Sequence, residues 1–221
     1  MEVRPEVEAG KSMAKTQAFD LYSNQYDHWF DKNPQFYKAE LEAVRQLMPH
    51  SSSNGLEVGV GSGKFAVPLG VGTGVEPSPQ MAEQAIRLGI DVRNGVAEAL
   101  PFPDNSFSYI LMITTICFVD DIEQSFLEAY RVLQSGGCII VGFVDKESEI
   151  GKNYLERKNE SRFYQDATFY SAEEIFRYLQ AAGFSQIITK QTLFPGDFMA
   201  AVQDGHGAGS FVVIKATKPE L

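Results

Sequence analysis

The stretch "LEVGVGSGKF", residues 56–65, decides the fold of this chain. Glycine alternates with other residues at Gly59, Gly61 and Gly63. One carboxylate, Glu57, stands in the apolar run before them. Glycine has no Cβ atom, so the backbone can take positive φ angles and approach a ligand closely. Because a helix start also offers free N–H groups, we expect residues 56–65 to join a first strand to a first helix beside a bound nucleotide.

Strand-like and helix-like segments alternate after this turn. The short apolar runs rich in β-branched residues are GLEVGV (55–60), GVGTGVEP (70–77), IDVRNG (90–95), YILMIT (109–114) and GCIIVGFV (137–144). Helical periodicity separates them in residues 78–89 and in "DIEQSFLEAYRVLQSGG", residues 121–137, where the two glycines are expected to stop the helix. This order predicts an α/β fold with a mostly parallel sheet and right-handed crossovers.

The C-terminal part of the sequence reads as one helix and two strands. Ser171 and Glu174 form a capping box at the start of the helix, and Gly183 ends it. The two strands that follow, 185–194 and 209–218, are joined only by a glycine-rich acidic loop. We therefore expect these two strands to pair antiparallel.

One domain with two accessory segments is the predicted organisation. Residues 1–18 are expected to form a flexible N-terminal tail, and residues 19–221 a single domain. Within it, residues 19–50 form an N-terminal helical lid, and the charged residues 145–170 form a partly helical insertion or second lid. The aromatic residues of the first lid recur at helical spacings of three and four, at Phe19, Tyr22, Tyr26, Trp29 and Phe30.

Composition and charge argue against several classes of partner. The formal net charge is -10 and no cluster of Lys and Arg is visible, which disfavours nucleic acid and anionic membranes. The N-terminus has no apolar core of a signal peptide, and the longest apolar run is too short to span a bilayer. Cys117 and Cys138 lie in apolar runs without metal-ligand spacing, so we expect no metal, and buried thiols in a cytoplasmic protein.

The spacing of the glycines favours one kind of nucleotide ligand. A dinucleotide fingerprint, G-x-G-x-x-G, would need glycine at position 64, which is Lys64. A second acid, Glu76, ends the next strand, where a carboxylate can accept hydrogen bonds from both ribose hydroxyls. A third marker, "GVAEALPFPDNSF" at 95–107, leads into the fourth strand.

At these residues the chain resembles the class I S-adenosylmethionine-dependent methyltransferases. It is most similar to their small-molecule, type 11 group, which includes quinone-biosynthesis methyltransferases. The motifs that carry the resemblance are E-x-G-x-G-x-G at 57–63, Glu76, "AEALPFPDNSF" at 97–107 and "EAYRVLQSGG" at 128–137, in that order. The resemblance implies a Rossmann-like three-layer α/β/α sandwich. Its seven-stranded, mostly parallel sheet would have an antiparallel last strand.

The resemblance also implies which residues bind the cofactor, S-adenosyl-L-methionine. Glu57 would hold the ammonium of the methionine moiety through water. The backbone at Gly59, Gly61 and Gly63 would lie against that moiety and the ribose. Glu76 would accept the ribose hydroxyls.

The adenine and methyl ends of the cofactor would meet other residues. Pro77 and Met81 would line the adenine face. Ala97 would offer its N–H to an adenine nitrogen, with Glu98 adjacent. Thr114 would lie near the donor methyl. From the aromatic stripe, Tyr26 is the best candidate to touch the cofactor, since aromatic faces attract the sulfonium charge. The stripe can equally serve to dock the helix on the core.

This chain departs from the family pattern at several positions. Many relatives carry Asp where Val96 stands, so the adenine amino contact is either absent or supplied by Glu98. Ser108 replaces another common Asp. Cys117 and Phe118 replace a frequent pair of histidines, so no catalytic role is transferred to them.

No catalytic constellation is visible, and the reaction does not demand one. Displacement at a sulfonium depends on positioning, and a base is needed only for an acceptor of high pKa. The catalytic residue is therefore left unknown. His28, beside the aromatic stripe, and His206, in the loop after the sixth strand, are weak candidates for contact with the acceptor. Surface positions explain both histidines equally well.

The sequence thus predicts a methyltransferase acting on a small molecule by in-line displacement. Residues 114–118, "TTICF", lack the Asn/Asp-Pro-Pro-Tyr run of enzymes that methylate nucleic-acid amino groups. Two alternatives stay open: a non-catalytic member that binds cofactor or a partner, and an NAD(P)- or flavin-dependent oxidoreductase. The acceptor, its target atom, any general base and the oligomeric state are not predicted.

Overall fold

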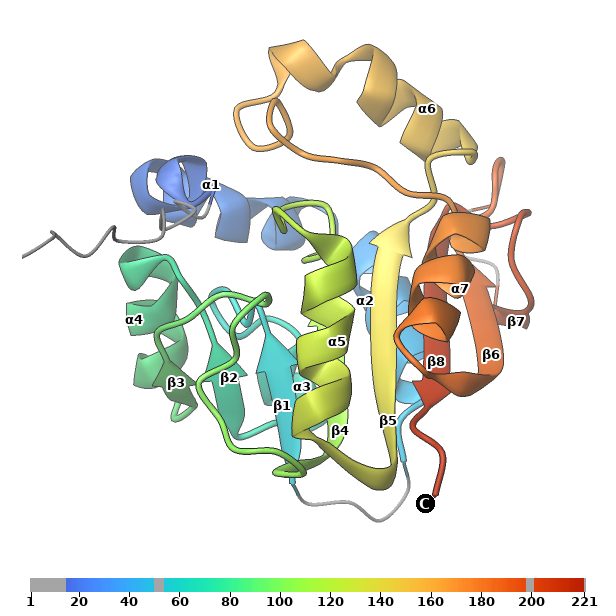
Figure 1. The fold of residues 1–221 in the computed structure, drawn as a ribbon. Coiled ribbons are helices and arrows are strands. Elements are labelled where there is room, and N and C mark those ends of the chain that lie inside the picture. The colour runs from blue at the N-terminus through green and yellow to red at the C-terminus, as the bar shows by residue number, and fades with distance from the viewer. Residues whose placement is uncertain (1–14, 50–53, 198–200, 221) are drawn as a thin grey trace, which may run out of the picture.

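A computed structural model describes residues 15–49, 54–197 and 201–220, so most of the predicted tail, residues 1–18, lies outside the described residues. The strands form one sheet in the order β3-β2-β1-β4-β5-β8-β6-β7 (Figure 1). Their bounds are β1 Gly55–Val58, β2 Thr73–Val75, β3 Asp91–Arg93, β4 Phe107–Ile113, β5 Leu133–Val144, β6 Ser185–Thr192, β7 Gln203–Asp204 and β8 Phe211–Thr217.

The pairing of the strands confirms the predicted fold class. β1 pairs in parallel with β2 and β4, β2 pairs in parallel with β3, and β4 pairs in parallel with β5. The last strand, β8, lies between β5 and β6 and runs antiparallel to both. The sheet is therefore mostly parallel, with the antiparallel C-terminal pair expected from the short connection between β6 and β8.

One edge strand goes beyond the predicted seven. The two-residue strand β7 lies in the loop between β6 and β8, and pairs antiparallel with Lys190 and Gln191 of β6. The Lys190 Nζ atom lies 2.7 Å from an oxygen of Asp204, directly across this pairing. An opposite-charge pair across two strands favours their pairing. Part of the predicted glycine-rich loop is therefore a short sheet edge.

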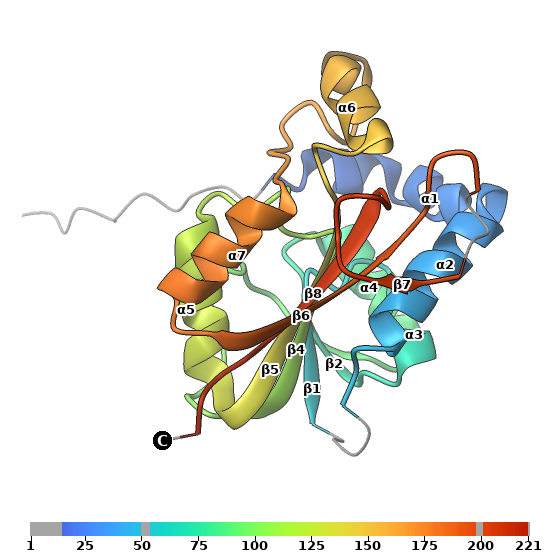
Figure 2. The ribbon, with the colours of Figure 1, turned by 90° about the vertical axis from the view of Figure 1, so that its right-hand side faces the viewer.

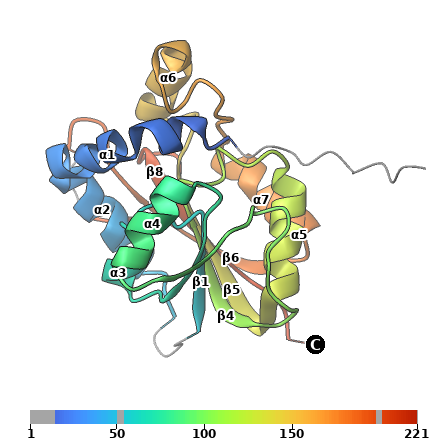
Figure 3. The ribbon, with the colours of Figure 1, turned by 90° about the vertical axis from the view of Figure 1, so that its left-hand side faces the viewer.

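Helices cover both faces of the sheet, which makes three layers (Figures 2 and 3). Their bounds are α1 Gln17–Lys32, α2 Pro34–Arg45, α3 Ala66–Leu69, α4 Pro79–Arg87, α5 Ile122–Val132, α6 Glu149–Glu156 and α7 Ala172–Ala181, with a 3₁₀ turn at Lys158–Glu160. The helices α5 and α7 lie on one face, and α2, α3 and α4 lie on the other. Ser171 and Glu174 form the predicted capping box of α7.

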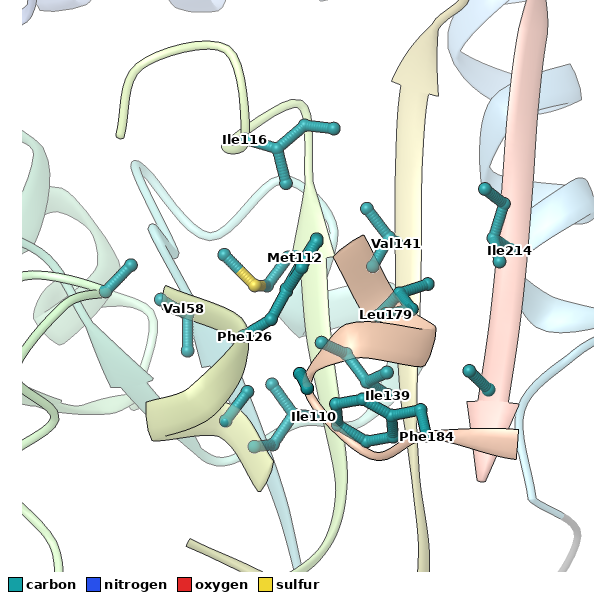
Figure 4. Close-up of a cluster of buried hydrophobic side chains, with 14 of the residues drawn as sticks. Val58, Ile110, Met112, Ile116, Phe126, Ile139, Val141, Leu179, Phe184 and Ile214 are labelled. Carbon is teal, nitrogen blue, oxygen red and sulfur yellow. The ribbon is translucent and has the colours of Figure 1, made fainter. Parts of the chain in front are cut away.

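Side chains of the central strands alternate between two buried cores. Ile110 and Met112 of β4 pack with Phe126 of α5 on one face (Figure 4). Leu111 of β4 packs on the opposite face with Val44 of α2. A strand buried on both sides explains why its sequence is a nearly continuous apolar run.

The end of α5 differs from the prediction. The glycines at 136–137 were expected to stop this helix, yet it ends at Val132 and Leu133 already begins β5. The Lys218 Nζ atom donates hydrogen bonds to the carbonyl oxygens of Tyr130 and Leu133, at 2.8 and 2.7 Å. A cation that satisfies the last carbonyls stabilises a helix end. Lys218, which lies far along the chain, therefore stabilises the point at which α5 ends.

Two elements lie above the carboxyl ends of the parallel strands. Figure 1 shows α1 over the ends of β1 and β2, and α6 over the end of β5. The predicted insertion, residues 145–170, contains α6 and the 3₁₀ turn. In open α/β sheets this edge is where ligands bind.

Candidate functional site

A cavity of about 340 Å³ opens at the carboxyl edge of the sheet, below α1. Its floor includes Val58 of β1, Val75 of β2 and Ile113 of β4, and Phe19 and Tyr26 of α1 contribute to its roof. The ends of three neighbouring strands therefore meet at this cavity, and one helix covers it.

Most of the predicted cofactor residues line this one cavity. They come from α1, the glycine turn, the end of β2, the start of α4, the segment before β4 and the end of β4. The predicted residues found in the wall are Tyr26, Gly59, Gly61, Glu76, Pro77, Met81, Ala97, Glu98 and Thr114. Glu57 and Gly63 were predicted with them and are not part of the wall.

The glycine turn needs its glycines for backbone and spatial reasons. Gly59, Gly61 and Gly63 have φ angles of 70°, 55° and 86°, which side chains rarely allow. A Cβ atom on Gly63 would lie 2.9 Å from Cδ1 of Ile90. The Gly61 N–H donates a 2.9 Å hydrogen bond to Oε2 of Glu76. The turn is thus held against the acid that ends the next strand.

Glu76 is a buried carboxyl group that can accept further hydrogen bonds. It follows β2 and is only 7% exposed. Besides the bond from Gly61, its Oε1 accepts a 2.9 Å hydrogen bond from the Ser78 N–H. Burial raises the pKa of Glu76 to about 7, although the hydrogen bonds from Ser78 and Gly61 each lower this pKa. Each carboxylate oxygen has a second lone pair, so the group can also accept a pair of neighbouring hydroxyls.

Glu57 lies behind the turn instead of in the cavity wall. Leu56 and Val58 point into the core under α5, so Glu57, between them on β1, points to the other face. It is 2% exposed and accepts a hydrogen bond from the Ala66 N–H at the start of α3. Burial and the charge of Glu76 hold the pKa of Glu57 well above its usual range.

The residues present fit the implied cofactor. Oε2 of Glu57 is buried and has no hydrogen-bond partner among the described residues. The turn above it is bare of side chains at three glycines, and Glu76 retains acceptor capacity. Aromatic rings and Met81 supply apolar surface in the same cavity. Such a site suits a nucleoside whose other end is a cationic amino acid.

Tyr26 stands at the centre of an aromatic cluster over the cavity. Its ring lies 5.6 Å from that of Phe19, 5.4 Å from Phe30 and 5.9 Å from Phe163. Its hydroxyl bonds to the side chain of Thr114, and burial raises its pKa. Thr114 has a φ of 55°, a strained value for a residue with a branched side chain. Strain of this kind is common at functional sites.

Glu98 already has protein partners. Its Oε1 accepts hydrogen bonds from the N–H groups of Asp120 and Asp121, at 2.7 and 3.1 Å. These bonds tie the segment before β4 to the start of α5. Glu98 therefore shapes the cavity wall whether or not it also reaches a ligand.

The two histidines are not brought to the cavity. His28 is exposed on α1, with Nδ1 3.0 Å from the carbonyl oxygen of Asn24. His206 lies beside α7, with Nε2 3.1 Å from a carboxylate oxygen of Glu173 and its ring 5.0 Å from that of Phe176. The weak catalytic candidates of the sequence therefore lie elsewhere on the surface.

Polar contacts that the sequence did not predict hold α1 over the cavity. The Ser78 hydroxyl donates to Asp20 and the Ser62 hydroxyl to Asp27, both at 2.5 Å. Lys64 Nζ lies 3.6 Å from Asp27. No local spacing signals these contacts, since each joins α1 to a residue more than thirty positions away.

The described residues contain two free cysteines, no metal-ligand cluster and no membrane-spanning helix. Cys117 and Cys138 are free thiols, and burial raises the pKa of Cys117 to about 12. Residues 15–49, 54–197 and 201–220 contain no group of His, Cys, Asp and Glu placed to hold a metal ion. In the same ranges, every helix is too short or too polar to cross a membrane.

Comparisons with known proteins agree with the geometry. The family described as "Methyltransferase domain" matches residues 56–141. A crystal structure from Thermotoga maritima, named "SAM-dependent methyltransferase, possible histamine N-methyltransferase", is 46% identical, with a TM-score of 0.88; the match covers 92% of this chain and 99% of that one. The uncharacterized protein MJ1123 of Methanocaldococcus jannaschii is 42% identical over 203 residues, which are 90% of this chain and 98% of that protein. A demethylmenaquinone methyltransferase of Chlorobaculum tepidum is 28% identical, over 74% of this chain and 77% of that one.

Proposed function

Because the chain belongs to the class I S-adenosylmethionine-dependent methyltransferases, in their type 11 group, we propose that it methylates a small-molecule acceptor. The observation that carries the proposal is the cavity under α1, where the glycine turn and the buried Glu76 meet. The carboxylate of Glu76 would bind the ribose, and Pro77 and Met81 would line the adenine. Glu57 would act from behind the turn on the cationic tail.

The protein's own contribution to the reaction is binding and exclusion of water. When bound, the cofactor supplies a methyl group on a positively charged sulfur, which makes direct displacement possible. Tyr26 and Thr114, whose side chains form a hydrogen bond with each other, would close the cavity on the side of the methyl group. Phe19 and Phe118 pack edge to face at 4.9 Å and would shield the same end from water.

Several observations favour a small acceptor over a macromolecule. The cavity is covered by α1, and residues 145–170 stand over the neighbouring strand β5 (Figure 1). In our proposal these segments are the two lids of a single domain, so only a small molecule reaches the methyl group. The net charge of -10 disfavours nucleic acid. We further propose a cytoplasmic location, which the two free thiols support.

Binding of S-adenosylhomocysteine, the demethylated product, tests the proposal. We expect isothermal titration calorimetry to give saturable one-site binding, with no comparable heat from NAD⁺. Release of S-adenosylhomocysteine from S-adenosylmethionine in the presence of a panel of small acceptors then tests turnover. Absence of binding at millimolar product would contradict the methyltransferase site. Tight binding without turnover on any acceptor would favour the non-catalytic alternative.

A further inference from the structure

A second cavity, of about 430 Å³, lies between the start of α1 and the segment 162–166, which follows the 3₁₀ turn. Lys15, Thr16 and Phe118 line this cavity and also line the cofactor cavity. The two cavities are therefore neighbours that meet at Phe118. A molecule held in the second cavity would lie beside the cofactor instead of in its place.

Aromatic rings join the two cavities. The ring of Phe163, in the wall of the second cavity, lies 5.6 Å from that of Phe19 and 5.9 Å from that of Tyr26. Phe19 and Tyr26 line the cofactor cavity. The Phe118 ring, which both cavities share, lies 4.9 Å from the Phe19 ring. These rings form an apolar surface between the two cavities, and such a surface favours an aromatic ligand.

Arg162 is an exposed cation of the second cavity without an anionic partner. Its guanidinium carbon lies 5.0 Å from the centroid of the Tyr22 ring, which lines the same cavity. In the described part of the chain, Arg162 has no ion pair and no hydrogen bond. Arg131, by contrast, forms ion pairs with Glu128 and Asp104. A guanidinium that rests on a ring keeps its N–H donors for a carboxylate, which it can bind with two parallel hydrogen bonds.

The charges of the wall favour a ligand with a single negative charge. Lys15 is the second cation, and its Nζ lies 3.6 Å from a carboxylate oxygen of Asp120, which lines the cofactor cavity but not the second one. Asp166 is the one acid among the residues of the second cavity that the structure describes. Two positive side chains against one negative leave the wall with a net charge of +1, whereas the whole chain carries -10.

We propose that the second cavity is the acceptor site and that the acceptor is an aromatic monocarboxylic acid. This inference rests on the proposed methyltransferase function and names its substrate class. The carboxylate would bind to Arg162 and Lys15. The aromatic ring would lie against Phe118, with the atom to be methylated directed toward Tyr26. An amine would be repelled by the two cations, a neutral acceptor would gain no ion pair with Arg162, and a dianion would exceed the charge of the wall.

Binding of carboxylates to the protein saturated with S-adenosylhomocysteine tests this inference. The probes are 3-phenylpropionate and 2-naphthoate, their neutral amides, the cation 3-phenylpropylamine and the dianion phenyl phosphate. The variants are Arg162→Gln and the control Arg157→Gln, whose exposed side chain pairs with Glu160 outside the cavity wall. We expect ligand-observed NMR titrations to show carboxylate binding that falls about tenfold or more in Arg162→Gln and is unchanged in Arg157→Gln.

The remaining outcomes separate this inference from the methyltransferase function. Unchanged affinity for S-adenosylhomocysteine in Arg162→Gln is expected, and it also shows that the variant folds. An equal loss of S-adenosylhomocysteine affinity would overturn the inference, since Arg162 would then serve the cofactor. Amides, amine or phosphate that bind as tightly as the carboxylates would overturn it as well. The same holds for equal losses of carboxylate binding in both variants, and for no carboxylate binding beside intact cofactor binding. Failure of S-adenosylhomocysteine itself to bind would instead refute the proposed function.

Discussion

At the scale of single residues, the chain buries several carboxyl groups, of which Glu76 lines the cavity. Glu57, Glu76 and Glu40 lie on three separate elements, and burial raises the pKa of each. Burial makes the charged form of each of these carboxyls unfavourable in the free protein. In the proposed function, the ribose and the ammonium group of the cofactor would supply hydroxyl donors to Glu76 and positive charge to Glu57.

Replacing Glu76 by alanine should weaken the binding of S-adenosylhomocysteine. The change removes the proposed ribose acceptor and leaves the Gly61 and Ser78 N–H groups without their partner. We expect a loss of about 1–3 kcal/mol, measured by calorimetry. The control Glu83→Ala, at an exposed position of α4, should bind as the parent does. Equal affinity of Glu76→Ala and the parent would remove Glu76 from the cofactor site.

At the scale of elements, α1 covers the cavity and is held there by polar contacts at two points. One point is the Asp20–Ser78 hydrogen bond beyond β2, and the other joins Asp27 to Ser62 and Lys64 of the glycine turn. The helix is kinked at Tyr22, whose φ and ψ are -129° and 24°. Fastening through a few polar contacts suits an element that opens to admit a ligand.

Removing one fastening should speed the release of bound cofactor product. We expect Asp27→Ala to raise the dissociation rate of S-adenosylhomocysteine roughly two- to tenfold, the worth of one net hydrogen bond of about 0.5–1.5 kcal/mol. Stopped-flow displacement measures this rate. Asp31→Ala, on an exposed position of the same helix, serves as the control. If both variants release the product at the parental rate, α1 is not held closed by Asp27.

At the scale of the whole molecule, the buried acids couple stability to pH. The pKa of Glu40 is about 8 in the folded protein, against an ordinary value of 4.5. Between these values the folded state binds a proton that the unfolded state has released. The stabilisation by this proton is complete below pH 4.5 and is lost as the pH rises through 8, at no more than about 1.4 kcal/mol per pH unit.

The free energy of unfolding of the ligand-free protein should therefore fall as the pH rises from about 5 to 8. We expect Glu40→Gln to fall less steeply, because glutamine exchanges no proton, while Glu42→Gln follows the parent. Urea denaturation at several pH values measures these slopes. Parallel curves for the parent and Glu40→Gln would mean that Glu40 ionises in the folded protein as it does in the unfolded chain.

Features that depend on local spacing could be predicted from the sequence. The order of strands and helices follows from apolar periodicity, the turn at 59–63 from glycines that must take positive φ, and the capping box of α7 from two side chains three residues apart. The position of Glu76 at the cavity could be predicted because it follows the second strand, and the carboxyl ends of parallel strands meet at one edge of the sheet. The family resemblance follows from the same short motifs.

Only the tertiary structure decided on which face of the sheet each buried acid lies and which residues surround it. Glu57 lies behind the turn because strand alternation and the position of α3 bury it there. Lys218 ends α5, and Asp27 holds α1, through contacts between residues far apart in the chain. Glu40 looks like one more charge on an amphipathic helix in the sequence, and the packing of α2 on the sheet buries it. Burial and long-range contacts are collective properties of the packed chain, so no window of sequence contains them.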